Sequence, residues 1–379
     1  MDEERRAAVI HSFGGDDTVV RELLPQNESI AERADAAASK MAPEDLPLAD
    51  EAHVEPWTDY AAEGARLGVA TTLRERLVQL RFPIEEGISQ ADEYRRATLR
   101  GLFPSVGVGL ELTAADHLEL SIHPTPVGAI PILVAGSRED FVSLVRALTA
   151  RNEPVPVPES MGACMVKGLN NWDRVSRYRR RWESERERGR QTGTWQEEFK
   201  RLARQKELYQ DRFILLSRGP YSAVRADDVG LGVEEWLDLS LRIRRDHECC
   251  HYFTLRLFGS MKSCVLDELV ADTAGIVGAL GSYSADLALP FLGLESFPRY
   301  RQGGRLENYR ESALTDRAFE VQTRLVHSSI RNLEAFADEF PHQMGSPREY
   351  GSLLAGLCRL SLEEMAAPDM RELLLRAMG

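Results

Sequence analysis

The residues best suited to chemistry in this chain spell HECCH, at positions 247 to 251. This is an HExxH motif, in which two histidines can bind one zinc ion and the glutamate can act as a general base. The interpretation needs a helix, because only there do residues four apart project from one face. Apolar residues recur at three- and four-residue spacing from about 233 to 258, and Gly259 follows. We therefore predict a helix with His247 and His251 on one face and Glu248 beside them.

A second helical pattern, from about 264 to 280, supplies the acids that such a site needs. The short connection before it predicts an antiparallel helical hairpin. With the turn centred between residues 259 and 260, residues whose numbers add to 519 lie at matching heights, which pairs His251 with Glu268 and His247 with Asp272. We expect Glu268 to be the third zinc ligand and Asp272 to accept the N–H of His247.

This arrangement resembles the gluzincin zinc metallopeptidases, the thermolysin-like enzymes and zinc aminopeptidases, which combine HExxH with ExxxD on the next helix. The resemblance implies that His247, His251 and Glu268 bind Zn²⁺, that Glu248 is the base and that Asp272 orients a histidine. It covers about 40 of the 379 residues. The spacer, residues 252 to 267, is shorter than in the family, and no GxMEN segment of the aminopeptidases is present. Asp267 fits the site less well, because it points about 100° away from Glu268 around the helix.

Hydrolysis of an amide would also need a donor to the developing oxyanion. The candidates are Tyr309 and Arg310, in the sequence RLENYRES, and His327, at the edge of an apolar helical stripe. Each has a structural alternative. A histidine in that position commonly packs at the boundary of a core, and Tyr309 or Arg310 can cap or pair at a surface.

These residues favour a zinc-dependent metallohydrolase that cleaves an amide or peptide bond by metal-activated water, with Glu248 as general base. The substrate would be a peptide or a small molecule, and a narrow one, because an indiscriminate protease would endanger its own cell. One alternative is another zinc enzyme: a lyase, a cyclase or a tailoring enzyme of a biosynthetic pathway. Another is a non-catalytic interaction protein in which zinc only staples two helices. The motif could also be a coincidence on an ordinary helix.

The net charge of −13 and the pI near 5.3 argue against general binding to nucleic acid or to anionic membranes. The first 15 residues mix acids with bases and lack an apolar core, so we expect no secretion signal. Five cysteines without a CxxC pattern are typical of reduced thiols. We therefore expect a cytoplasmic protein, and the sequence does not indicate an oligomeric state.

The predicted fold class is α+β: mainly helical, with a zincin-like helical hairpin that carries the metal site and a small mixed β region before it. Residues 117 to 150 read as two strands and a helix, and residues 213 to 217 as a strand that could line the substrate cleft as an edge strand. Residues 174 to 206 are expected to form one long charged helix. A proline-rich linker at 152 to 160 suggests two domains: an N-terminal α/β region of unknown role at 1–155, and a mainly helical metal-binding domain at 156–379.

Overall fold

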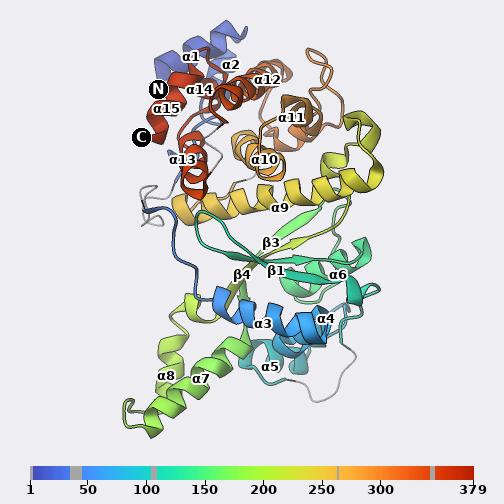
Figure 1. The fold of residues 1–379 in the computed structure, drawn as a ribbon, viewed down its shortest axis with the longest axis vertical. Coiled ribbons are helices and arrows are strands. Elements are labelled where there is room, and N and C mark those ends of the chain that lie inside the picture. Colours follow the sequence, from blue (N-terminus) through green and yellow to red (C-terminus); the bar gives the residue numbers. More distant parts are fainter. Residues whose placement is uncertain (1–2, 35–44, 104–108, 263, 342–345) are drawn as a thin grey trace. The chain divides into compact units, whose positions relative to one another are not determined.

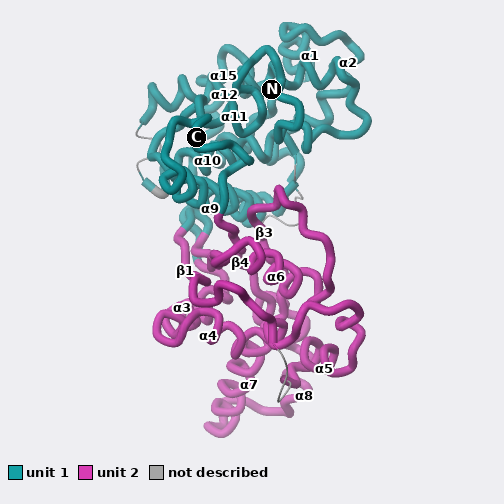
Figure 2. Tube along the Cα trace, turned by 90° about the vertical axis from the view of Figure 1, so that its right-hand side faces the viewer, with its two compact units in different colours: residues 1–49, 125–127, 219–379 teal, residues 50–124, 128–218 magenta. Residues whose placement is uncertain are grey.

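The computed structural model describes residues 3–34, 45–103, 109–262, 264–341 and 346–379 (Figure 1). The described residues form mainly helices and one four-stranded mixed sheet, which confirms the predicted α+β class. The chain divides into two compact units (Figure 2). Unit 1 holds residues 1–49, 125–127 and 219–379, and unit 2 holds residues 50–124 and 128–218. The linker expected at 152 to 160 lies within unit 2, between a helix and a strand.

The sheet of unit 2 has the strand order β1-β2-β4-β3. Its strands are β1 (Glu119–His123), β2 (Ile130–Val134), β3 (Ala163–Asn170) and β4 (Gln210–Leu216). The pairs β1/β2 and β3/β4 are antiparallel, whereas β2 and β4 run parallel. Strands β1 and β2 are the two strands predicted on either side of Pro124. Because β4 pairs on both sides, the expectation that this strand offers an edge to a substrate is wrong.

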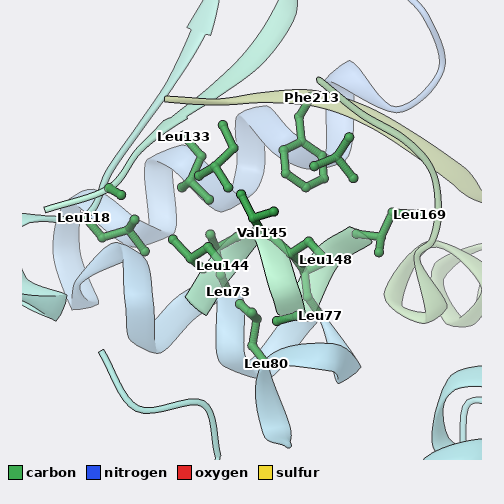
Figure 3. Close-up of a cluster of buried hydrophobic side chains, with 14 of the residues drawn as sticks. Leu73, Leu77, Leu80, Leu118, Leu133, Leu144, Val145, Leu148, Leu169 and Phe213 are labelled. Carbon is green, nitrogen blue, oxygen red and sulfur yellow. The ribbon is translucent and has the colours of Figure 1, made fainter. Parts of the chain in front are cut away.

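The described part of unit 2 also contains helices and 3-10 segments, of which those at 54–67 and 138–149 pack against the sheet. They are α3 (Val54–Leu67), α4 (Val69–Arg76), η2 (Val78–Arg81), η3 (Ile88–Gln90), α5 (Asp92–Arg100), η4 (Ala115–His117), α6 (Arg138–Thr149), α7 (Trp172–Glu187), α8 (Trp195–Leu202) and η5 (Lys206–Leu208). α6 begins where Ser137 accepts a hydrogen bond from the Asp140 amide, as its sequence predicts. Leu144 and Leu148 of α6 pack in one buried cluster with Leu133 and Phe213 of the sheet (Figure 3).

The predicted charged helix at 174 to 206 is in fact two helices, α7 and α8. The residues between them include Gly189 and Gly193, whose φ angles are 73° and 92°. These left-handed conformations end α7 and redirect the chain, and glycine adopts them without steric penalty. A capping box at Thr194 then starts α8.

The described part of unit 1 is helical. Its elements are α1 (Glu3–Ser12), α2 (Asp17–Leu23), η6 (Tyr221–Ala223), η7 (Ala226–Val229), α9 (Val233–Phe258), α10 (Val265–Leu280), α11 (Ala285–Leu292), η8 (Arg305–Tyr309), α12 (Asp316–Glu339), α13 (Pro347–Leu357), α14 (Leu362–Ala366) and α15 (Met370–Met378). A buried ion pair joins Arg6 of α1 to Glu363 of α14, with 3.0 Å between Nε and Oε2. The beginning and the end of the chain therefore pack together in this unit.

The helices α9 and α10 form the predicted hairpin and approach each other closely. α9 ends at Gly259, which adopts a left-handed conformation, and α10 ends in the same way at Gly281. A Cβ atom on Gly275 of α10 would lie only 2.7 Å from the Ile243 carbonyl oxygen of α9. Only glycine lets the two backbones come this close, and this spacing determines how far side chains must reach between the helices.

Within the described ranges, no helix combines the length and the apolar character that crossing a membrane requires.

Candidate metal centre

The two histidines of HECCH and the first acid of α10 converge in the buried interior of the hairpin. The Nε2 atoms of His247 and His251 lie 3.2 Å apart. Glu268 faces both: its Oε2 is 3.4 Å from Nε2 of His247, and its Oε1 is 3.6 Å from Nε2 of His251. All three residues are less than one-tenth exposed. The three expected ligands therefore present one donor atom each to a common point.

These separations suit a small tetrahedral cation. Ligand atoms arranged tetrahedrally at about 2.0–2.1 Å from zinc lie roughly 3.3–3.4 Å from one another. The three observed distances, 3.2, 3.4 and 3.6 Å, bracket that value. Two imidazole nitrogens and a carboxylate at such distances need a proton or a cation between them, because their lone pairs repel. Two nitrogens and one oxygen are also a donor set that zinc commonly takes in catalytic sites, with the fourth position left open.

His247 is oriented by groups behind its ring. Its Nδ1 lies 3.0 Å from Oδ1 of Asp272 and 2.8 Å from the Tyr221 hydroxyl. That hydroxyl donates in turn to Asp272 Oδ1, at 2.7 Å. A proton on Nδ1 satisfies the carboxylate and leaves the Nε2 lone pair free to bind a cation. Together with the contact between His251 and Glu268, these bonds confirm the helical registry predicted from the sequence.

Arg305 balances the charge of Asp272. Its guanidinium forms an ion pair with the Asp272 carboxylate and donates to the Tyr221 hydroxyl at 3.0 Å. Burial by itself would raise the pKa of Asp272, but Arg305 and His247 outweigh it and hold this pKa well below its usual range. Asp272 thus stays ionised as the acceptor of His247.

His247 and His251 differ electrostatically. Burial alone would lower the pKa of His247, but the hydrogen bond to Asp272 and the charges of Glu268 and Asp272 raise it. Burial and the neighbouring charge of His247 lower the pKa of His251. The neighbouring acids therefore raise the pKa of His247, whereas His251 is kept neutral, which is the form that binds a cation.

A strained turn places Tyr221 in the site. The next two residues, Ser222 and Ala223, have φ angles of 51° and 57°, which side-chain-bearing residues rarely adopt. α9 holds the turn: Ser240 accepts from the Tyr221 amide at 3.0 Å, and Arg244 donates to backbone carbonyls just before Tyr221. The helix that carries the histidines also fixes the tyrosine that orients one of them.

Two further predicted residues lie beside the ligands. Glu248 is half-buried next to His247, and its charge acts on both histidines. Among the described residues, none forms a hydrogen bond or an ion pair with the Glu248 carboxylate. The Tyr309 hydroxyl donates to Glu268 Oε2 at 3.0 Å. Burial and the charge of Glu268 raise the pKa of Tyr309 against the opposing effect of Arg305, so the phenol remains a donor at neutral pH.

The other predicted residues bond elsewhere. Arg310 donates to the Leu314 carbonyl and to Asp316, each at 2.7 Å. His327 stacks on Phe297, with 3.9 Å between ring centroids. The structure brings neither of them to the metal ligands, so the expectation that they assist catalysis is not supported by position. Asp267, set aside in the registry argument, forms an ion pair with Arg33.

Tyr221 and Arg305 were not predicted from the sequence. Tyr221 follows β4 in a turn, and Arg305 opens η8, so neither belongs to the regular helices on which the registry argument depends. One signal was available for Arg305. It begins the RLENYRES sequence that also contains Tyr309, and positions 305 and 309 lie one helical turn apart.

A sequence family described as a family of unknown function, DUF7005, matches residues 8–369 of the chain. The chain belongs to this family. The DUF7005 match spans both units and contains every residue of the candidate metal centre. No curated protein and no solved structure matches the chain. Membership of DUF7005 assigns no activity to the chain.

Proposed function

We propose that the protein is a zinc-dependent metallohydrolase, of gluzincin type, that cleaves an amide or peptide bond in a narrow range of substrates. One observation carries the proposal: the side chains of HExxH and ExxxD direct three donor atoms to one point, at separations of 3.2 to 3.6 Å. Such spacing fits zinc bonded to two imidazoles and one carboxylate.

In this proposal His247, His251 and Glu268 hold the ion. A zinc ion in an open site polarises a carbonyl group and lowers the pKa of water. Glu248 accepts the proton of the attacking water and delivers it to the leaving amine, for which its unpaired carboxylate is suited. Tyr309 is a protonated phenol beside the ligand set, so it is positioned to donate to the developing oxyanion.

We also propose that the enzyme works in the cytoplasm. None of the five cysteines forms a disulfide with another described residue, and Cys249, Cys250 and Cys358 are buried. Burial raises the pKa of the Cys250 thiol, which keeps it protonated and unreactive. Free buried thiols are typical of a reducing compartment, where a hydrolase needs narrow specificity to spare other proteins.

Two measurements on the full chain test the proposal. Metal analysis of the purified protein should give close to one zinc per chain. The variant Glu248→Gln should keep that zinc and lose hydrolysis of a peptide library, because the amide cannot accept the proton. Glu235→Gln is the matched control: this exposed glutamate lies on the same helix, away from the histidines, and its loss should leave zinc content and turnover unchanged.

A zinc content far below one ion per chain would overturn the proposal. If zinc is present but no peptide is cleaved, while a screen of small metabolites gives turnover that depends on Glu248, the enzyme belongs to the lyase, cyclase or tailoring class. If Glu248→Gln changes no activity in either screen, the ion is a structural staple between α9 and α10.

A further inference from the structure

Unit 2 contains a cavity that is separate from the metal-binding elements. Its volume is about 760 Å³, within the range of small-molecule sites. It runs along β3, an edge strand of the sheet, from Cys164 to Asn170, and residues of α5 and the end of α6 also line it. The proposed hydrolase uses none of these residues.

The ionisable lining of this cavity is cationic. Arg95, Arg151 and Lys167 all contribute to it, and no aspartate or glutamate lines it. None of the three cations forms an ion pair with another residue of the described ranges. The nearby Glu153 carboxylate is already engaged, because it accepts hydrogen bonds from the amides of Gly87 and Ser89. In a chain with a net charge of −13, three uncompensated cations around one cavity point to an anionic occupant.

The backbone around Arg151 is held in an unfavourable conformation. Arg151 and Asn152 have φ angles of 55° and 62°. The fully buried Asn152 fixes them: its Nδ2 donates to the carbonyls of Gln79 and Phe82 at 3.0 Å, and its Oδ1 accepts from the Tyr94 hydroxyl at 3.2 Å. Strain that is held this firmly is characteristic of binding sites.

Lys167 is also placed by an irregularity. The pairing of β3 with β4 shifts register between Lys167 and Leu169, and Gly168 between them has a φ of 75°. A bulge of this kind alters the direction of a side chain at the edge of a sheet. Separate deviations from regular geometry thus place two of the three cations at the same cavity.

A buried polar atom completes the lining. Gln79 is 7% exposed, and its side-chain Oε1 has no hydrogen-bond partner in the described structure. An unpaired buried carbonyl oxygen is unfavourable by about 1–3 kcal/mol. The atom is shielded from solvent as it stands, so a bound molecule with a hydroxyl or amino group would donate to it once the Gln79 side chain turns toward the cavity.

We propose that this cavity binds a small organic anion, a carboxylate or a phosphate, that also carries a hydroxyl or amino group. The anionic group pairs with Arg95, Arg151 and Lys167, and the hydroxyl or amino group donates to Gln79. This binding site does not depend on the zinc centre or on its chemistry.

Calorimetric titration of the full chain tests the site. The probes are inorganic phosphate, glucose 6-phosphate, succinate and malate, with glucose as the uncharged comparison. We expect a phosphate or a carboxylate probe to bind, glucose not to bind, and affinity to fall between about 50 and about 300 mM salt. The two groups of anions distinguish a phosphate ligand from a carboxylate ligand.

Variants locate the binding. The double variant Arg151→Gln, Lys167→Gln should lower the affinity for the anion by about tenfold or more. Arg96→Gln, on the same helix as Arg95 but outside the lining, should leave binding unchanged. Gln79→Leu should weaken the binding of malate, which carries a hydroxyl group, more than the binding of succinate, which lacks one. The proposal fails if no anion binds, or if the double variant binds as the wild type does.

Discussion

Asp272 accepts hydrogen bonds from three directions, and this makes it the most connected residue behind the candidate metal ligands. His247 and Tyr221 share its Oδ1, and Arg305 pairs with its Oδ2. The Asp272 carboxylate therefore determines the tautomer of His247, the position of the Tyr221 phenol and the ion-pair partner of the part-buried Arg305.

Replacing Asp272 with asparagine should weaken zinc binding by about 10- to 100-fold, because the group that accepts the hydrogen bond from His247 Nδ1 loses its charge. The measurement is competition for zinc against a chromophoric chelator. Asp267→Asn is the control, since that buried acid of the same helix pairs with Arg33 and not with a ligand. Equal losses in both variants would show that only general destabilisation of α10 is being measured.

Tyr309→Phe should keep zinc and lower kcat by about 10- to 1000-fold, because the phenol is the protonated donor beside Glu268. Steady-state kinetics with any substrate found in the peptide library would measure it. Arg310→Gln and His327→Gln should each retain kcat, since both side chains bond away from the ligands. Loss of activity in those two variants, with Tyr309→Phe unaffected, would contradict the assignment.

At the scale of elements, the hairpin of α9 and α10 explains why part of the site could be predicted. Regular helices have fixed periodicity, so counting from the turn was enough to pair His247 with Asp272 and His251 with Glu268. Tyr221 could not be predicted in this way, because a turn with left-handed residues places it. Arg305 reaches the site from a short 3-10 segment for which no registry exists.

The fold shows the same contrast. Strands β1 and β2 and helix α6 carry clear alternation or capping signals, and the structure contains them. Strand β3 was not predicted, since its sequence ACMVKGLN is interrupted by Gly168 at a bulge and lacks a regular alternation. The long helix expected at 174 to 206 was wrong, because charge pattern alone did not reveal that Gly189 and Gly193 end it.

Gly275 tests how much the site depends on the approach of the two helices. Gly275→Ala places a methyl group 2.7 Å from the Ile243 carbonyl, so we expect a loss of about 1–3 kcal/mol in the free energy of unfolding and weaker zinc binding. Chemical denaturation and chelator competition measure the two effects. Gly232→Ala, at the N-cap of α9, has no atom within 4 Å of the new methyl group and should change both far less. A stabilised Gly275→Ala variant would show that helix propensity outweighs the contact.

For the whole molecule, removal of zinc should affect the two units unequally. A ligand stabilises what it binds, by about 4 kcal/mol at 1000 times its Kd. Chelation should therefore speed amide hydrogen exchange in α9 and α10, as measured by mass spectrometry, and leave β2 and β4 protected, because unit 2 has a buried cluster of its own. Equal loss of protection in both units would contradict this expectation, as would no change in α9.

The ion pair between Arg6 and Glu363 has a consequence for biosynthesis. The two residues are 357 positions apart, and the whole of unit 2 lies between them in the sequence. At roughly 5–20 residues per second, a ribosome needs roughly 20–70 s to supply Glu363 after Arg6. During that interval, α1 has emerged without its partner, whereas unit 2 can already fold. Helix α1 is thus synthesised before unit 2 but gains its ion-pair partner only after unit 2 has been made.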